Sequence, residues 1–417
     1  EFREICCGGL AFAAGVLADA LTTPGGIVCL ARDGGLDLSS DQLPEPCGAG
    51  EVAESVRLVT RLQCVEVVAA GFFGALDRRD WGKRKLDAQS SDMPVFSFIG
   101  LWDFDCDRWS SKNFVLMGVM IFFHTASSYG KAGLAAEHVT ITRKAMGAIP
   151  EPDEVMFCPI DLQQDGVLIH SFVGEQHLQA DFANEYLGGA VMRGGGSQEE
   201  ELFLCCPELL ATLFLVERML DFEAVEIAGL RRYVDHNMCS GKTWSRSDQF
   251  CRPVPEAERL VNLTTVAMDA ICFNSYGKLS KSEQYQPANV RREVRKCLVA
   301  LRPPAAAGPG ARRSFVTGLW GCGAFRGDPE LKCVIQWICC SLDASVDKMI
   351  FCPFDQRECL SHAGLAELVD LLPGRVSAKR VLDLLVEDQD YAWSSSTFRY
   401  LLKKLASVGD SPQPPSS

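Results

Sequence analysis

Beyond about residue 130, short strand-like runs alternate with helix-like runs, and this alternation restricts the fold more than any other feature. In 138–142, Val139 and Ile141 fall on one side and polar residues on the other, as in a half-buried strand. Asp328 and Pro329 precede a long apolar run, in the arrangement that usually starts a helix. Strands that alternate with helices indicate an α/β layer structure. We expect further strands at 155–158, 167–169, 224–227, 263–273, 314–317 and 348–354, and a helix at 207–220.

The first third of the chain has a mainly helical character. Val52, Val56 and Val59 fall near helical spacing, which predicts a helix over 51–76, and 113–127 predicts another. The apolar stretches 5–21 and 114–123 are too short, and the first too interrupted, to predict a membrane span. We therefore expect no membrane association.

Composition limits the partners and the compartment. The 417 residues are 47% hydrophobic, enough for a large core, and the net charge of −13 argues against a broad nucleic-acid-binding patch. The 19 cysteines follow no CxxC or zinc-like spacing. Such a pattern favours buried free thiols in a reducing, intracellular compartment and gives no reason to expect a metal.

The segment 179–210, QADFANEYLGGAVMRGGGSQEEELFLCCPELL, carries most of the chemical information. Its glycines allow positive φ and close backbone approach, so the loop can direct several N–H groups at an anion. The glutamates that follow would repel a phosphate, but they suit a neutral sugar placed beside it. Two simpler interpretations remain open: glycine-rich loops are often flexible surface loops, and consecutive glutamates often mark a solvated helix start.

This segment resembles the signature of poly(ADP-ribose) glycohydrolases, in which a glycine-rich loop precedes Gln-Glu-Glu. The order of DFAN, Gly-Gly, QEE and PEL is similar, and a second block, TGLWGCGAFRGD at 317–328, is similar to a Trp-Gly-Cys-Gly-Ala-Phe loop of the family. Shorter matches support the resemblance: 71–73 with 78–79, 244–246 and 268–270.

The resemblance implies an α/β fold of macrodomain type, a mixed sheet between helices. It would occupy 129–406, and a helical accessory region over 1–128 would precede it. Independently of the resemblance, the Pro/Ala/Gly composition of 303–313 predicts a surface insertion, and the small, polar, proline-bearing residues of 407–417 predict a disordered tail. The implied activity is hydrolysis of ribose–ribose bonds in poly(ADP-ribose), without a cofactor.

The resemblance also implies roles for particular residues. Glu200 would donate a proton to the leaving ribose oxygen and then take one from water, Glu199 would hold ribose hydroxyls, and Asp181 would order the site. The resemblance further implies a set of substrate-binding residues: Asn184, Gly188, Gly189, Gln198, Trp320, Gly321, Cys322, Gly323, Ala324 and Phe325. Glycosidic cleavage needs a protonated carboxyl near the leaving oxygen, and crowded glutamates raise at least one pKa in the group.

The chain departs from the family pattern in several places. Leu319 stands where the family usually has asparagine before the second loop, and Arg326 replaces a glycine after it. Ala190 stands where the family has a third loop glycine. The family's adenine-stacking tyrosine is absent from 234–243, where Met238 lies near its position, and Tyr233 or Phe354 are the alternatives.

Three functional hypotheses follow. The first is an active hydrolase that acts on poly(ADP-ribose) and ADP-ribosylated proteins as a monomer, in the nucleus or cytoplasm, within the DNA damage response. The second is a macrodomain that binds ADP-ribose without cutting it. The third, another nucleotide-using α/β enzyme such as an oxidoreductase, is disfavoured because the dinucleotide fingerprint GxGxxG is absent.

Overall fold

A computed structural model of the chain describes residues 2–22, 48–76, 93–102, 111–163, 172, 174, 176–236, 251–255, 262–274, 279–308, 310–353, 362–388, 390–391 and 396–406. The expected strand at 167–169, the tail at 407–417, Met238, Phe354 and the short matches at 78–79 and 244–246 lie outside these residues.

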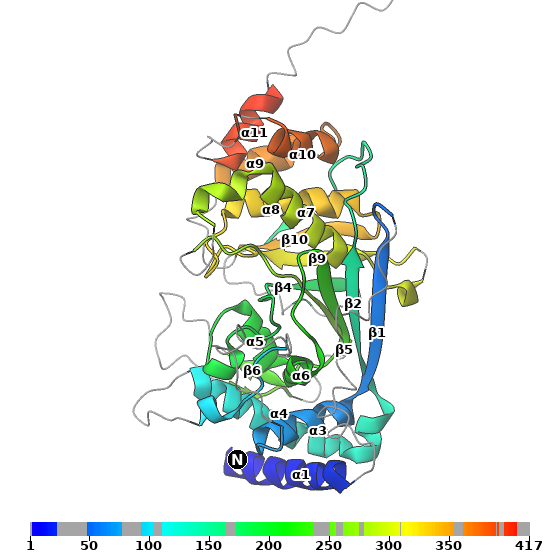
Figure 1. The fold of residues 1–417 in the computed structure, drawn as a ribbon, viewed down its shortest axis with the longest axis vertical. Helices are drawn as coiled ribbons and strands as arrows, with labels where there is room; N and C mark the ends of the chain where they lie inside the picture. Colours follow the sequence, from blue (N-terminus) through cyan, green and yellow to red (C-terminus); the bar gives the residue numbers. More distant parts are fainter. Residues whose placement is uncertain are drawn as a thin grey trace, which may run out of the picture.

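The centre of the fold is a mixed sheet of eight strands in the order β1-β2-β5-β8-β4-β9-β10-β3 (Figure 1). Neighbours from β1 to β8 pair antiparallel, whereas β8, β4, β9, β10 and β3 run parallel. The strands are β1 Val52–Thr60, β2 His138–Met146, β3 Ile160–Leu162, β4 His177–Asp181, β5 Glu223–Leu230, β8 Leu263–Ala267, β9 Arg313–Gly318 and β10 Val346–Cys352. A separate pair joins β6 Val234–His236 to β7 Cys251–Pro253.

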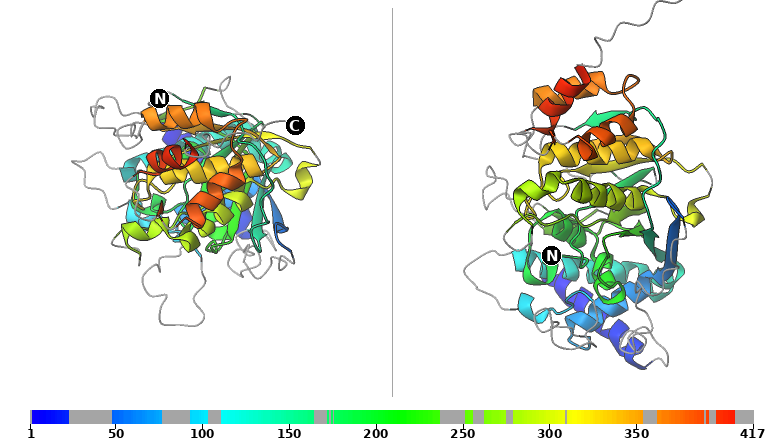
Figure 2. Two further views of the ribbon diagram at one scale, coloured as in Figure 1. Left: turned by 90° about the horizontal axis from the view of Figure 1, so that it is seen from above. Right: turned by 45° about the horizontal axis from the view of Figure 1, so that its top comes forward.

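Helices cover both faces of the sheet (Figures 1 and 2). One layer holds α7 Pro287–Leu301, α8 Pro329–Leu342, α9 His362–Leu371, α10 Ala378–Val386 and α11 Thr397–Ala406. The other layer holds α1 Phe2–Thr22, α3 Arg61–Phe72, α4 Ser111–Ala136, α5 Gln198–Cys205 and α6 Thr212–Leu215. Each layer buries its own apolar core against the sheet. On β4, the side chains of Leu178 and Ala180 join the core beneath α7 and α8. Successive side chains of a strand point to opposite faces, so Asp181, which follows Ala180, faces the α5 layer.

The expectation of a helix over the whole of 51–76 is wrong for its first half. Residues 52–60 form β1, which pairs with β2 along its full length, and α3 begins only at Arg61. Thr60 and Gln63 form a capping box in which each side chain accepts from the other's backbone N–H, at 3.1 and 2.9 Å. The β-branched residues before Thr60 suit a strand, so the helical spacing of the valines was misleading.

The predicted accessory region 1–128 therefore supplies the edge strand of the sheet, and α4 continues past residue 128 to Ala136. The division at residue 128 stays a prediction. Residues 303–308 and 310–312 connect α7 to β9 and are largely exposed, and their assignment as an insertion stays a prediction.

Several other sequence expectations are confirmed, with shifted ends: the strands β2, β5, β8, β9 and β10 and the helices α4 and α8. Two are wrong. Residues 155–158 form no strand beyond one bridge from Met156 to Ser377, and 207–220 holds only a 3₁₀ turn, Pro207–Ala211, followed by the single turn α6.

The expectation that the apolar stretch near the N-terminus is too short and too interrupted to span a membrane is also wrong, because one helix there is long enough and apolar enough to do so. Residues Ile5–Thr22 of α1 form an 18-residue window of mean hydropathy 1.8, of which 33% is buried. In the structure α1 packs against α3 and α4. Core helices and signal sequences meet the same criteria, so this finding alone does not place the helix in a membrane.

Candidate active site

The predicted acidic residues meet where β4 ends. β4, β8 and β9 run in the same direction, so the loops that follow them share one edge of the sheet. Asp181 is the last residue of β4 and pairs in register with Ala267, the last residue of β8. At such an edge, the loops and helix starts of an open α/β sheet commonly form the ligand site.

Asp181 is fully buried, and among the residues that the structure describes neither of its carboxyl oxygens has a hydrogen-bond partner. Burial, together with the neighbouring charge of Glu200, raises the pKa of Asp181 well above its ordinary value. A buried carboxyl without donors favours its neutral form, so Asp181 tends to keep a proton.

Glu199 lies in the first turn of α5, with 3% of its surface exposed. Its carboxylate accepts hydrogen bonds from the backbone N–H groups of Asn184 at 3.0 Å and Gly188 at 2.6 Å. Burial, then the charges of Asp181 and Glu200, raise the pKa of Glu199, and the two backbone N–H groups oppose this rise.

Glu200 is 5% exposed and accepts from two further backbone N–H groups, those of Ala190 at 2.9 Å and Ser197 at 2.7 Å. The second contact belongs to a capping box in which Ser197 is the N-cap of α5. Ser197 was not among the sequence-predicted site residues, although the Ser-x-x-Glu spacing could have identified it.

The glycine loop allows these carboxylates to approach the backbone. Gly189 has φ +49°, and a Cβ there would lie 2.6 Å from a Glu199 oxygen. A Cβ at Gly195 would lie 2.8 Å from both the Glu200 carboxyl and the Ala190 methyl. Gly195 is a second residue that the sequence did not single out, and it accommodates the extra methyl of Ala190.

Gln198 and Asn184 hold the loop together. The Gln198 amide accepts from Phe182 N–H at 2.8 Å and donates to the Ala180 carbonyl at 3.1 Å, so it fastens α5 to β4. The Asn184 side chain accepts from Tyr186 N–H at 3.0 Å. Both residues lie beside the acidic side chains. Gly188, which lies between them in the sequence, has φ +79°.

The second predicted loop, after β9, lies next to this cluster, because β9 is the neighbour of β4. A Cβ at Gly318 would be 3.5 Å from the Phe182 ring, which follows Asp181. Gly321 has φ +71°, and its carbonyl accepts from Gly327 N–H at 2.9 Å, which closes the loop before α8 starts. Gly323 and Ala324 are exposed and Phe325 and Cys322 are partly exposed, so this loop can present backbone N–H groups to an anion.

The Trp320 ring cannot stack on a ligand. It is fully buried, its Nε1 donates to the Met268 carbonyl at 2.8 Å, and the Lys332 ammonium lies 4.0 Å from the ring centroid. Only its backbone remains for a substrate. Tyr233, an alternative for the adenine, is also buried, and its hydroxyl donates to Glu208 at 2.5 Å.

Burial also excludes the interpretation of 199–201 as a solvated helix start, since all three glutamates are less than 6% exposed. The described lysines and arginines form no ion pair with Asp181, Glu199 or Glu200. In the described part of the chain, no group of His, Cys, Asp or Glu has a geometry that could hold a metal ion, and the cysteines there are free thiols.

A sequence profile described as poly(ADP-ribose) glycohydrolase (PARG), macro domain fold, matches residues 151–361, just over half of the chain. The chain is 35% identical over 189 residues to poly(ADP-ribose) glycohydrolase 1 of Caenorhabditis elegans, an alignment that covers 43% of this chain and 23% of that protein. It is 25% identical over 272 residues to poly(ADP-ribose) glycohydrolase 1 of Arabidopsis thaliana, covering 49% of this chain and 48% of that protein. The chain thus spans about a quarter to a half of these relatives.

Among solved structures, the poly(ADP-ribose) glycohydrolase of Thermomonospora curvata is similar over 82% of this chain and 92% of that one, with 15% identity and a TM-score of 0.34. A similarity of this size is too weak to support an inference about the site.

Proposed function

The chain belongs to the poly(ADP-ribose) glycohydrolase family, and from this membership we propose that it hydrolyses the ribose–ribose bonds of poly(ADP-ribose) and releases ADP-ribose. The observation that carries the proposal is the group Asp181, Glu199 and Glu200: carboxyls buried at one sheet edge, two of them held by backbone N–H groups of a glycine loop. Burial and like charges raise the pKa values of Asp181 and Glu199, and perturbed pKa values of this kind are typical of functional sites.

In this proposal Glu200 is the general acid and base. Its proton passes to the 2′ oxygen of the leaving ribose as the bond from that oxygen to the anomeric carbon breaks. Water then attacks the anomeric carbon and gives its proton to Glu200, which restores the acid. Glu199 and Glu200 are adjacent on one helix and cannot flank the two faces of a sugar, which favours a single acid–base group.

Asp181 and Glu199 support Glu200 in different ways. Protons in a cluster of close carboxyls are shared, so a proton that burial keeps on Asp181 lowers the charge next to Glu200. Glu199, whose oxygens are fixed by Asn184 and Gly188, is placed to hold ribose hydroxyls. The loop 321–325 would bind the diphosphate through backbone N–H groups.

The test is incubation of the purified chain with labelled poly(ADP-ribose), with products separated by chromatography. The proposal expects ADP-ribose to be released by the wild type and by Glu201→Gln, a neighbouring buried carboxyl on the same helix, but not by Glu200→Gln. Binding of ADP-ribose without any release from polymer would contradict hydrolysis and favour a binding macrodomain.

The substrates would include ADP-ribosylated proteins, and we propose a monomer that acts in the nucleus or cytoplasm. Size-exclusion chromatography with light scattering tests the monomer, and a dimer at micromolar concentration would contradict it.

A further inference from the structure

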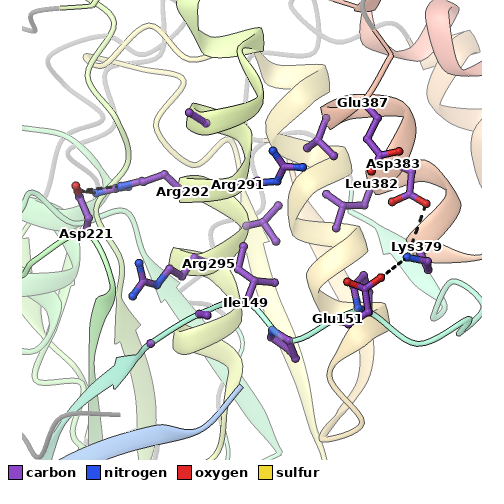
Figure 3. Close-up of a pocket in the computed structure, with 17 residues that line it drawn as sticks. Ile149, Glu151, Asp221, Arg291, Arg292, Arg295, Lys379, Leu382, Asp383 and Glu387 are labelled. Atoms are coloured by element: carbon purple, nitrogen blue, oxygen red, sulfur yellow. Dashed lines mark hydrogen bonds and ion pairs between the residues drawn. The ribbon is translucent and has the colours of Figure 1, made fainter. Parts of the chain in front are cut away.

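A pocket of about 560 Å³ lies between α7, α10 and residues 147–152, the segment that follows β2 (Figure 3). We call it the α7–α10 pocket. Its volume lies within the range of roughly 300–1,000 Å³ that is usual for small-molecule sites. None of the predicted site residues lines it.

Two arginines of α7 line this pocket and form no ion pair within the described residues, although the charge of Asp221 acts on Arg295. Arg291 is exposed and pairs with no carboxylate in the described part of the chain. Arg295, one turn further along α7, donates to the Met146 carbonyl at 2.8 and 2.6 Å and lies 5.1 Å from the Phe222 ring centroid. Like charges at this helical spacing repel each other, so a bound anion would relieve a cost that is already present.

The other cations of the pocket are already paired. Arg292 holds Asp221 at 2.9 Å and Asp269 at 2.5 Å, and Lys379 holds Glu151 at 2.8 Å (Figure 3). Lys379 also lies 4.0 Å from Asp383. Arg291 and Arg295 are therefore the lining cations that form no ion pair within the described residues, in a lining whose four cations are matched in number by four carboxylates.

The remaining lining suits a nucleoside better than a bare phosphate. Ile149, Leu382 and Val386 give an apolar surface, and Asp383 of α10 and Glu387, the residue that follows α10, offer acceptors for hydroxyl or amino groups. Guanidinium groups bind phosphates on one side, while a base and a ribose can use the other. The carboxylates of Asp383 and Glu387 would repel a bare anion but can accept from sugar hydroxyls.

The pocket shares an edge of the sheet with the acidic cluster. β2, β8 and β4 run in the same direction, so residues 147–152 leave the sheet at the edge where Asp181 ends β4. Arg292 donates to the carbonyl of Asp269, two residues beyond the end of β8, and so fastens α7 to the loop at this edge. The three strand steps from β2 to β4 correspond to a separation along the sheet of roughly 14 Å at the usual spacing of about 4.8 Å, with the pocket in the α7 and α10 layer and the acidic cluster on the α5 side.

We propose that the α7–α10 pocket is a second binding site for an ADP-ribose unit, with Arg291 and Arg295 on its diphosphate and α10 beside its nucleoside. The choice of ADP-ribose as the ligand rests on the proposed function, whereas the nucleoside diphosphate chemistry rests on the pocket alone. On a polymer, such a site would hold a unit other than the one being cut.

The test is calorimetric titration of the full chain with free ADP-ribose, comparing the wild type with Arg291→Glu and with the double variant Arg291→Ala/Arg295→Ala. Arg291→Glu is the main variant, because Arg291 is exposed and contributes no described contact to the fold. Arg399→Glu, an exposed arginine of α11, is the charge-matched control.

The proposal expects two sites in the wild type and in Arg399→Glu, with one of them weakened at least tenfold in both pocket variants. If the wild type has a single site and the pocket variants lose it, the result would support the pocket and contradict the binding expected at the acidic cluster. Unchanged stoichiometry and affinity in Arg291→Glu, or no binding to the wild type, would overturn the proposal. Equally tight binding of inorganic diphosphate at the Arg291 site would overturn the nucleoside assignment.

Discussion

Buried carboxylates occur in several parts of the described chain, and two of these regions differ in whether cations pair with them. Along β5, Glu223 pairs with Arg143 at 2.6 Å and Glu226 with Lys144 at 2.9 Å, all of them buried. At the end of β4, the acidic cluster of Asp181, Glu199 and Glu200 is buried to the same degree but receives only backbone N–H groups.

The pKa values follow this difference. Burial alone would raise the pKa of Glu226, but Lys144 and Arg313 lower it below its ordinary value. In the acidic cluster burial and like charges act together, and the pKa values of Asp181 and Glu199 rise. Buried charge that serves the fold is paired, whereas the unpaired cluster carries an energetic cost that is consistent with a chemical role.

The largest effect we expect is on turnover. Glu200→Gln keeps the shape of the side chain but cannot supply the proton, so kcat should fall by about 10²–10⁴-fold. Affinity for ADP-ribose, measured by calorimetry, should stay within about tenfold. A variant with more than roughly a tenth of wild-type kcat would contradict the assignment of the acid.

The next effect is on stability, at another buried carboxylate that is paired with a cation, Glu208. Arg61 joins β1 and α3 to the sheet through ion pairs with Glu208 and, at 2.8 Å, with Glu137. Arg61→Met would leave Glu208 buried without its cation, at a cost of about 3–5 kcal/mol in unfolding free energy. Denaturant unfolding measures this, and Arg312→Met, at an exposed pair with Asp347, is the control that should change stability by less than about 1 kcal/mol. An equal loss of unfolding free energy in Arg61→Met and Arg312→Met would contradict the difference between a buried and an exposed ion pair.

Asp181→Asn should change stability in the opposite direction. The amide keeps the shape and need not take up a proton to be buried, so we expect a stability gain of up to about 1 kcal/mol at neutral pH together with a loss of activity. Thermal and denaturant unfolding at pH 7 give the comparison. Destabilisation by more than about 2 kcal/mol would mean that the carboxylate of Asp181 has a structural partner.

The smallest effect is on the pH dependence of stability. Because the folded-state pKa values of Asp181 and Glu199 are raised, the folded chain binds more protons than the unfolded chain above about pH 4. Their contribution to stability is complete below that pH and is lost as pH rises through the raised values. The double variant Asp181→Asn/Glu199→Gln should show a flatter profile between about pH 5 and 8.

Glu226 provides the opposite sign in the same experiment. Because the pKa of Glu226 is lowered in the folded state, Glu226 stabilises the fold at pH values above its ordinary pKa. This contribution is lost when the pH falls through the lowered pKa. Glu226→Gln should therefore leave the slope between about pH 5 and 8 unchanged. Equal slopes in the wild type and the Asp181/Glu199 double variant would contradict the raised values.

The sequence predicted the acidic cluster better than it predicted its surroundings. Asp181, Glu199 and Glu200 come from one short segment whose glycines and acids are visible in the sequence, and the structure brings them together. Pairing over long separations is not visible in the same way. Arg61 and Glu208 are 147 residues apart, and no local pattern marks either as the other's partner.

Local spacing also failed where a long-range contact decides the structure. Val52, Val56 and Val59 satisfy a helical period, yet pairing with β2 makes them a strand. The α/β class survived this error because the later strands and helices are each favoured by their own residues, as at Asp328 and Pro329. Tyr233 was an alternative for the residue that stacks on the adenine, but in the structure it is buried and its hydroxyl donates to Glu208.

The central claim is that Asp181 and Glu199, whose pKa values are raised, hold a proton at neutral pH, whereas Glu226, whose pKa is lowered, does not. Infrared absorption of protonated carboxyl groups at pH 7 tests this directly, in a Glu66→Gln background because burial and then Asp19 raise the pKa of Glu66 to about 7. We expect a protonated carboxyl band that weakens in Asp181→Asn and again in the double variant with Glu199→Gln, but not in Glu226→Gln. A band that persists unchanged without Asp181 and Glu199, or no band in the starting protein, would contradict the account.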